Sequence, residues 1–117
     1  NATLGCSQME QLPEFLKIKR KLFSFWKEAL EDADASFFIP TKESESNYWL
    51  NAIICSSKKE RNQILKITNQ NGVMTRPIWK LMSSLPMFSK CQNDGLDNSL
   101  WLEQRVVNIP SSVYYKP

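Results

Sequence analysis

The α+β character of the chain is decided by residues 48–77, YWLNAIICSSKKERNQILKITNQNGVMTRP. Within them, Tyr48 to Cys55 presents largely apolar side chains on both of its alternating faces. A strand with two apolar faces is typical of a position inside a sheet. The stretch therefore predicts an internal strand.

A helix and a second strand follow this stretch. Ser57 and Glu60 have the spacing of a capping box, and Asn71 with Gly72 is a typical helix end. Val73 to Arg76 then resumes a strand pattern. Strand, capped helix and strand predict a compact α+β unit, with a small antiparallel or mixed sheet packed by helices.

The N-terminal third is predicted to be helical. Ala2 to Leu12 has a helical pattern, and Pro13 suits the first turn of a second, longer helix, so we expect a kink between them. The apolar stripe of the second helix covers about half of its circumference. It consists of Phe15, Leu16, Ile18, Leu22, Phe23, Phe25, Trp26, Ala29 and Leu30. So wide a stripe needs more cover than one sheet provides.

The remaining segments are shorter. Ser36 to Ile39 predicts a strand, Thr41 to Ser46 a polar turn, and Ser89 to Asp94 a polar loop. Leu96 to Val107 has one more helical pattern, which Ile109 and Pro110 end.

Length and composition indicate one globular domain. The chain has 117 residues, of which 42% are hydrophobic and 23% charged. A folded monomer of this mass exposes roughly 6,600 Å², so about two thirds of the unfolded surface can be buried. No apolar run is long enough to cross a bilayer and no leader pattern opens the chain, so we expect a cytoplasmic protein without a membrane partner.

Several kinds of site are excluded by what is missing. The sequence has no histidine, which removes Ser-His and Cys-His pairs and histidine-ligated zinc. Cys6, Cys55 and Cys91 are widely separated and are expected to be reduced and mostly buried, with no metal site. The three glycines are too scattered for a phosphate-binding loop.

The net charge of +3 does not by itself indicate a nucleic-acid partner. Acidic and basic residues are interspersed along the chain. The one basic cluster, Lys17, Lys19, Arg20 and Lys21, lies within an amphipathic segment and is interpreted as a solvated helix face.

Four segments, in order and with matching spacing, resemble a known family. They are Asn1 to Leu12 (NATLGCSQMEQL), Asn71 to Met82 (NGVMTRPIWKLM), Leu85 to Phe88 (LPMF) and Val107 to Ser112 (VNIPSS). The first is similar to the start of the C-terminal part of the DegT/DnrJ/EryC1/StrS family of pyridoxal-phosphate-dependent sugar aminotransferases. The others resemble the branch acting on UDP-linked 4-keto-6-deoxy-N-acetylhexosamines in bacillosamine and legionaminic acid synthesis.

The resemblance implies that residues 1–117 form the C-terminal small domain of a fold type I aminotransferase, cut from a longer protein. The large domain would hold pyridoxal phosphate, the Schiff-base lysine and the aspartate facing the pyridine nitrogen. None of the eleven lysines here lies in a segment similar to the cofactor-lysine motif. The fragment is thus expected to bind no cofactor and to be inactive alone. The parent would move an amino group, from glutamate, to a nucleotide sugar, as a homodimer.

The resemblance also implies three substrate-binding residues and no catalytic ones. In the family, the segment matching Arg76 to Ser83 approaches the substrate groove. Arg76 could pair with carboxylate or phosphate oxygens, and Trp79 offers an apolar face to a sugar or uracil. Many relatives have histidine where this chain has Ser83, and a hydroxyl can only hydrogen-bond. Structural alternatives stay open: a helix-end or carboxylate contact for Arg76, a core or interface position for Trp79, and a plain loop serine.

Two other functions are compatible with the residues. One is a free-standing α+β module that binds a small ligand or, weakly, nucleic acid. The other is a purely structural subunit contact through Phe15 to Leu30. Relatives with this fold that act as regulators or dehydratases leave the activity of the parent open as well.

Overall fold

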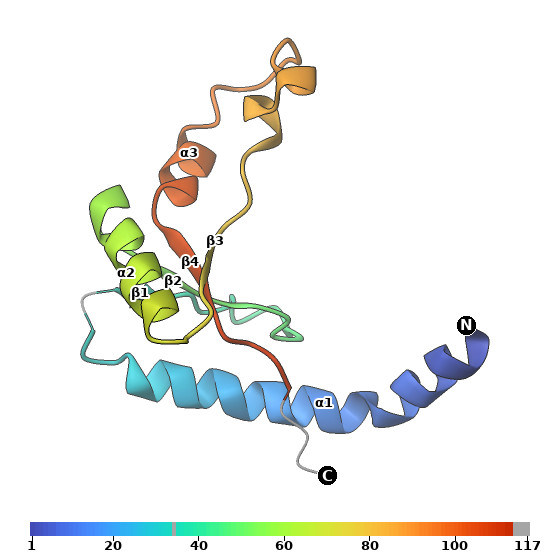
Figure 1. Cartoon of the computed structure of the whole chain (residues 1–117). Coiled ribbons are helices and arrows are strands. Elements are labelled where there is room, and N and C mark those ends of the chain that lie inside the picture. Colours follow the sequence, from blue (N-terminus) through green and yellow to red (C-terminus); the bar gives the residue numbers. More distant parts are fainter. Residues whose placement is uncertain (34, 114–117) are drawn as a thin grey trace.

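The computed structural model describes residues 1–33 and 35–113 and confirms an α+β arrangement (Figure 1). Its elements are α1 (Ala2–Ala29), β1 (Ser36–Phe37), β2 (Asn51–Ile54), α2 (Lys58–Gln70), β3 (Arg76–Pro77), η1 (Met82–Ser84), η2 (Pro86–Phe88), α3 (Asp97–Glu103) and β4 (Val106–Ile109). None of the described helices is long and apolar enough to cross a membrane.

The sheet has the order β1-β2-β4-β3, and its described neighbours all pair antiparallel. At its centre, Ile53 of β2 lies opposite Val107 of β4. The prediction that the strand containing Ile53 is internal is therefore confirmed. Because β2 and β4 are far apart in the sequence, their pairing brings the middle and the end of the chain together.

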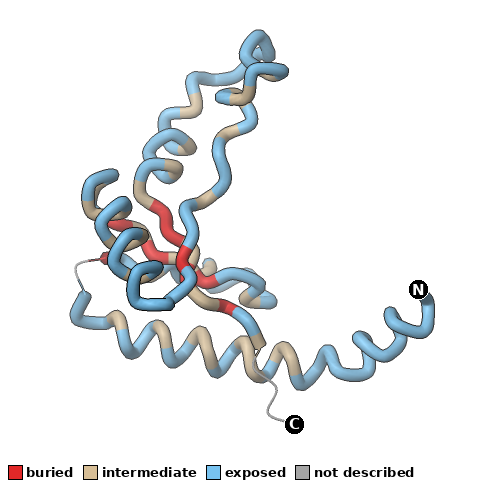
Figure 2. The backbone as a smooth tube through the Cα atoms, viewed as in Figure 1, coloured by how far each residue is buried: buried red, intermediate tan, exposed pale blue. Residues whose placement is uncertain are grey.

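One face of the sheet forms the core. Val107 and Cys55 are almost fully buried, and Ile53 and Ile109 share their face because strand side chains alternate. Trp26 of α1, Leu30 just after it, and Ile64 and Leu65 of α2 pack against this cluster. Figure 2 shows the buried positions in the strands and in the residues that flank them. On the opposite face, Val106 is buried, and Ala52, Ile54 and Asn108 are partly buried.

The N-terminal helix is one continuous α-helix of 28 residues with Pro13 inside it. Proline removes one backbone hydrogen bond, and Figure 1 shows the helix bending toward its N-terminal end. The predicted kink is present, but two separate helices are not. No residue of α1 is fully buried, and Phe25 and Ala29 of the expected apolar stripe are exposed. The chain thus covers less of this helix than its sequence calls for.

The termini of α2 follow the sequence signals. Ser57 Oγ accepts a hydrogen bond from the Glu60 N–H at 3.2 Å, as a capping box requires. The Glu60 carboxylate is directed to Ser56, whose N–H and Oγ–H each donate to it at 2.6 Å. After Asn71, Gly72 takes a φ of +77°, which favours glycine.

Three predicted strands are shorter or displaced. The strand expected from Tyr48 begins at Asn51, because Tyr48 has a φ of +50° and leaves the extended conformation. The strand expected at 36–39 spans Ser36–Phe37, and the one expected at 73–76 is Arg76–Pro77. Proline at the end of this last strand is tolerated because β3 is an edge strand.

The helix predicted from Leu96 to Val107 is wrong in its second half. Helix α3 ends at Glu103, and Val106–Ile109 forms β4. The branched side chains of Val106, Val107 and Ile109 favour a strand, and β4 gains hydrogen bonds from both β2 and β3. Long-range pairing thus overrides the local helical periodicity.

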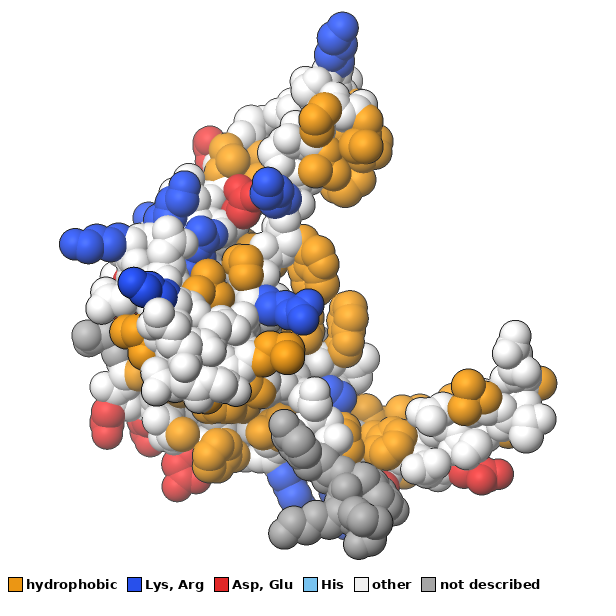
Figure 3. Space-filling model, viewed as in Figure 1, with side chains coloured by type: hydrophobic (Ala, Val, Ile, Leu, Met, Phe, Trp, Pro, Cys, Tyr) orange, Lys and Arg blue, Asp and Glu red, His pale blue; other side chains and the backbone are white. Residues whose placement is uncertain are grey.

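The chain is more open than a self-contained domain of its size. Its accessible surface of 9472 Å² exceeds the amount expected for this mass by about 2,900 Å². Its radius of gyration is 17.0 Å, against roughly 13 Å for a compact domain of this length. Figure 3 shows two arms projecting from the body, both with hydrophobic side chains on their surface. One is the N-terminal part of α1 and the other carries η1 and η2 (Figure 1).

The Glu60 contacts predict a pH dependence of stability. Hydrogen bonds from Ser56 hold the pKa of the Glu60 carboxyl below its ordinary value. Its contribution to folding is therefore present above that ordinary pKa and is lost as the pH falls through the lowered one. We expect Glu60→Gln to remove this component when the free energy of unfolding is measured in urea from pH 7 to pH 3. Glu10→Gln, an equal charge change on the exposed part of α1, is the control. Equal acid sensitivity in the Glu60→Gln variant and the unchanged chain would contradict the assignment.

Candidate functional site

An open concave surface lies at the end of the sheet where β2 and β3 begin and β4 ends. It is an open groove of about 940 Å³. Its lining residues are Trp49, Leu50, Gly72, Val73, Met74, Arg76, Pro77, Ile78, Trp79, Asn108, Ile109, Pro110, Ser111 and Ser112. Apolar walls with a few polar groups are typical of ligand-binding grooves.

Arg76 is the one charged residue among these lining residues. It begins β3 opposite Asn108 of β4, so the register of the sheet fixes its position. Its side chain is exposed, and its Nη2 makes a weak contact with Met74 Sδ at 3.7 Å. Neither ion pair within residues 1–33 and 35–113 uses Arg76. The guanidinium is therefore available to an anionic group.

Trp79 lies beside Trp49, a residue that the sequence analysis missed. The rings of Trp79 and Trp49 have centroids 6.1 Å apart and planes inclined by 33°. Their residues are 64% and 65% exposed, respectively, so neither belongs to the core. The sequence analysis placed Trp49 in an internal strand with two apolar faces, so it was not considered as a binding residue. The turn-forming Ser46 and Asn47 just before it are the signal that this strand starts later.

Ser83 does not join the other two predicted site residues. It is half-buried in η1, on the projecting arm, and is absent from the lining residues of the groove. The chain thus brings Arg76 and Trp79 together and leaves Ser83 apart.

The floor of the groove is held by Ser111. Its Oγ accepts hydrogen bonds from Asn51 N at 2.7 Å and Asn51 Nδ2 at 3.3 Å, and donates to the Ile109 carbonyl at 2.8 Å. Asn51 and Ser111 are both buried, and such buried polar groups need partners of this kind. This network fixes the segment that follows β4 against the start of β2.

Helix α1 is tied to the same segment by two side chains. Lys19 Nζ donates to the carbonyls of Ser111 at 2.6 Å, Trp49 at 3.3 Å and Tyr48 at 3.4 Å. Trp26 Nε1 donates to the Pro110 carbonyl at 3.0 Å. Burial lowers the pKa of the Lys19 ammonium. Lys19 is thus a structural tie under the groove.

The prediction that the whole basic cluster is a solvated helix face is therefore wrong for Lys19. Its other members, Lys17, Arg20 and Lys21, are exposed as expected. Lys17 pairs with Glu14 at 3.5 Å and Arg20 pairs with Glu45, both at the surface. Exposed pairs of this kind contribute little to stability.

The cysteines and acidic residues form no second site. Cys55 is buried as predicted, and burial raises the pKa of its thiol, which keeps it in the unreactive protonated form. Cys6 and Cys91 are exposed, against the prediction, because one lies on the projecting start of α1 and the other just after η2. Over the described residues, no cluster of His, Cys, Asp and Glu could hold a metal ion.

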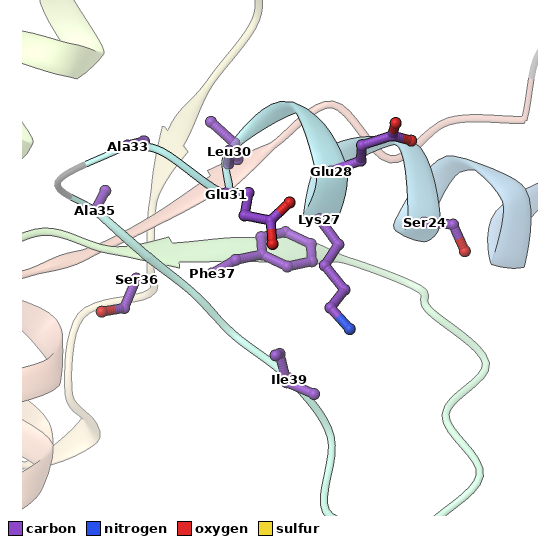
Figure 4. A pocket seen from close by; sticks show the side chains of 10 residues that line it. All are labelled: Ser24, Lys27, Glu28, Leu30, Glu31, Ala33, Ala35, Ser36, Phe37 and Ile39. Carbon is purple, nitrogen blue, oxygen red and sulfur yellow. The ribbon is translucent and has the colours of Figure 1, made fainter.

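A second depression of about 530 Å³ lies between the end of α1 and β1 (Figure 4). The side chains of Lys27, Glu31 and Phe37 come together there, and Glu28 points away from them. Opposite charges lie side by side in this depression, so it favours no ligand of one sign. The groove with Arg76 is the stronger candidate site.

Comparison with known proteins gives a consistent result. The sequence model of the DegT/DnrJ/EryC1/StrS aminotransferase family matches residues 1–116. GDP-perosamine synthase of Escherichia coli O157:H7 is 26% identical over 112 residues, which are 94% of this chain and 30% of that protein. The chain thus spans about a third of the length of this relative.

Two solved structures share the fold. The aminotransferase TlmJ from Streptoalloteichus hindustanus superposes with a TM-score of 0.85 at 16% identity, over 94% of this chain and 30% of that one. The E. coli GDP-4-keto-6-deoxy-D-mannose-3-dehydratase, solved with bound hydrated PLP, gives a TM-score of 0.66 at 19% identity, over 92% of this chain and 29% of that one. At these identities the likeness concerns the fold alone.

The Lys19 tie predicts a specific loss of stability. Lys19→Met removes hydrogen bonds from a charged donor to three carbonyls, and we expect the free energy of unfolding to fall by about 1.5–3 kcal/mol. Lys21→Met, the same change at an exposed site of the same helix, should alter it by about 0.5 kcal/mol or less. The measurement is denaturant unfolding followed by far-UV circular dichroism. Equal effects of the two substitutions would show that Lys19 makes no such tie.

Proposed function

Because this chain belongs to the DegT/DnrJ/EryC1/StrS aminotransferase family, we propose that it is the C-terminal small domain of a fold type I, pyridoxal-phosphate-dependent sugar aminotransferase. The observation that carries the proposal is the family match over residues 1–116. In this proposal, residues 1–117 are one domain, and the large cofactor-binding domain lies in a part of the protein outside this chain.

The described groove does not by itself fit pyridoxal phosphate. The cofactor needs a lysine amine for its Schiff base and an acidic partner for its pyridine nitrogen. The lining residues include no lysine, aspartate or glutamate. When bound, pyridoxal phosphate supplies the electron sink for amino transfer, and the proposal assigns its binding groups to the rest of the protein.

The role of this chain is to bind substrate. Arg76 would hold anionic oxygens of the nucleotide sugar, since charge-assisted pairs with a guanidinium are strong and directional. Trp79 would cover an apolar ring face and keep water from it. Ser83 would act by hydrogen bonding from the projecting arm, once the rest of the protein brings the arm and the groove together.

The proposed substrate is a UDP-4-keto-6-deoxy-N-acetylhexosamine, with glutamate as amino donor, as in legionaminic acid and bacillosamine synthesis. The support is the likeness of residues 71–82, 85–88 and 107–112 to that branch. The name of GDP-perosamine synthase concerns a GDP-linked sugar, so both nucleotides belong in the test. We also propose a cytoplasmic homodimer, because the surplus exposed surface needs cover of the size found in obligate interfaces.

The test of the activity uses the chain together with its neighbouring coding sequence. This longer protein is expected to acquire the visible absorbance of bound pyridoxal phosphate. It should transfer ¹⁵N from glutamate to the UDP-keto sugar, detected by mass spectrometry, in preference to the GDP-keto sugar. The 117-residue chain should do neither. A longer protein that binds no cofactor, or a chain that transaminates alone, would contradict the proposal.

Arg76 gives a prediction about substrate affinity. Arg76→Gln in the active protein should raise KM for the nucleotide sugar by about 10- to 100-fold, since it removes a charge-assisted contact of about 1.5–3 kcal/mol. Arg20→Gln, at an exposed arginine outside the groove, is the matched control. An unchanged KM in the Arg76→Gln enzyme would exclude Arg76 from the substrate site.

A further inference from the structure

Trp49 combines an exposed side chain with a tightly constrained backbone. Tyr48, just before it, has a φ of +50°, a conformation that a bulky residue adopts only at a cost. Ser46 Oγ accepts from Tyr48 N, and Asn47 Oδ1 accepts from Trp49 N, both at 3.0 Å. Lys19 Nζ donates hydrogen bonds to the carbonyls of Tyr48 and Trp49. The position of Trp49 is therefore over-determined.

The side chains around Tyr48 explain how this strained turn persists. Its ring packs on Phe23 of α1 with centroids 4.3 Å apart. The neighbouring indole of Trp49 contacts the ring of Trp79, and the residue stays 65% exposed. A network that holds a large aromatic ring out at the rim of a groove indicates a binding role for that ring.

The two tryptophans of the groove cannot enclose a ligand between them. A ring inserted between two others needs about 7 Å, twice the carbon contact distance of about 3.5 Å. Trp49 and Trp79 are only 6.1 Å apart and are inclined to each other by 33°. They therefore act as one surface, and a ligand ring would lie on its open side.

The charge of the groove selects the ligand further. Among the described residues that line the groove, Arg76 is the only charged one, and Asn108 lies beside it as its partner in the sheet. A ligand whose ring lies on the two tryptophans and whose anionic group reaches Arg76 would use both the aromatic surface and the positive charge. A guanidinium can bind phosphate or carboxylate oxygens through two parallel hydrogen bonds, and phosphate is the anionic group that a nucleotide carries.

We propose that Trp49 and Trp79 form a one-sided platform for the ring of a phosphate-bearing ligand, a nucleotide or nucleotide sugar, while Arg76 binds its phosphate. Trp49 is a binding residue in this proposal and Lys19 is a positioning residue that holds it. The choice of nucleotide sugar as ligand rests on the proposed function. The platform itself rests on the geometry of the groove.

The test is direct binding to the chain, with UDP-N-acetylglucosamine, UDP and inorganic pyrophosphate as probes. In ¹H–¹⁵N spectra, the indole signals of Trp49 and Trp79 should shift on adding UDP-N-acetylglucosamine, and that of Trp101, which lies outside the groove, should not. Trp49→Ala should weaken the binding of UDP and of UDP-N-acetylglucosamine about tenfold, since base–aromatic stacking is lost. Pyrophosphate, which has no ring, should bind the variant unchanged.

Matched variants separate stacking from folding. Trp49→Phe keeps an aromatic face and should restore binding to within about threefold of the unchanged chain. Trp101→Ala removes an equally large exposed ring elsewhere and should leave all three affinities unchanged. Arg76→Gln should weaken all three probes, including pyrophosphate.

Two results would overturn the platform. One is that the Trp49→Ala variant and the unchanged chain bind UDP-N-acetylglucosamine with equal affinity. The other is no indole shift with any ring-bearing probe at millimolar concentration, which would make the tryptophans a contact surface for another part of the protein. Failure of the longer protein to transfer amino groups would refute the proposed activity and leave these binding results unaffected.

Discussion

The ammonium group of Lys19 is the contact on which the shape of the groove depends. It joins three backbone segments that are far apart in the sequence: helix α1, the turn before β2 and the segment that follows β4. The groove contains no residue of α1, yet the helix sets the distance between its walls. A lysine suits this position because its flexible stem crosses apolar surface and its head donates three hydrogen bonds. Methionine could replace its stem but none of these bonds.

This tie matters because the apolar core is small. The most deeply buried side chains are Val107 and Cys55, and α1 contributes only half-buried residues to the cluster. Because few apolar side chains are buried, hydrogen bonds from side chains are important for holding the tertiary structure together. The Ser111–Asn51 network and the Trp26–Pro110 hydrogen bond lie beside the Lys19 tie and strengthen the same junction. Both projecting arms carry exposed apolar side chains, as expected of a domain that other parts of a protein cover.

Local signals in the sequence predicted the fold well, and long-range contacts account for the errors. The ends of α2 were predictable because Ser57, Glu60 and Gly72 act within a few residues. The end of α3 was not, because Val106 and Val107 become a strand only when β2 lies beside them. In the candidate site, Arg76 and Trp79 were predicted from the resemblance to a family, and both line the same groove. Trp49 was missed because the alternating apolar pattern of residues 48–55 predicted a strand from Tyr48, whereas β2 starts at Asn51.

The chemistry available in the groove limits what this chain can do. A single guanidinium, two indole rings, the amide of Asn108 and the hydroxyls of Ser111 and Ser112 line the groove, and such groups can bind and orient a ligand. They provide no group with a pKa near neutrality that could move a proton, and the chain has no histidine elsewhere to supply one. Because one fold can serve different reactions, the proposed amino transfer would depend on groups that other parts of the protein bring to the open side of this groove. A rigid, one-sided binding surface is suited to that arrangement, since it fixes one face of the substrate and leaves the other face free for the reactive groups.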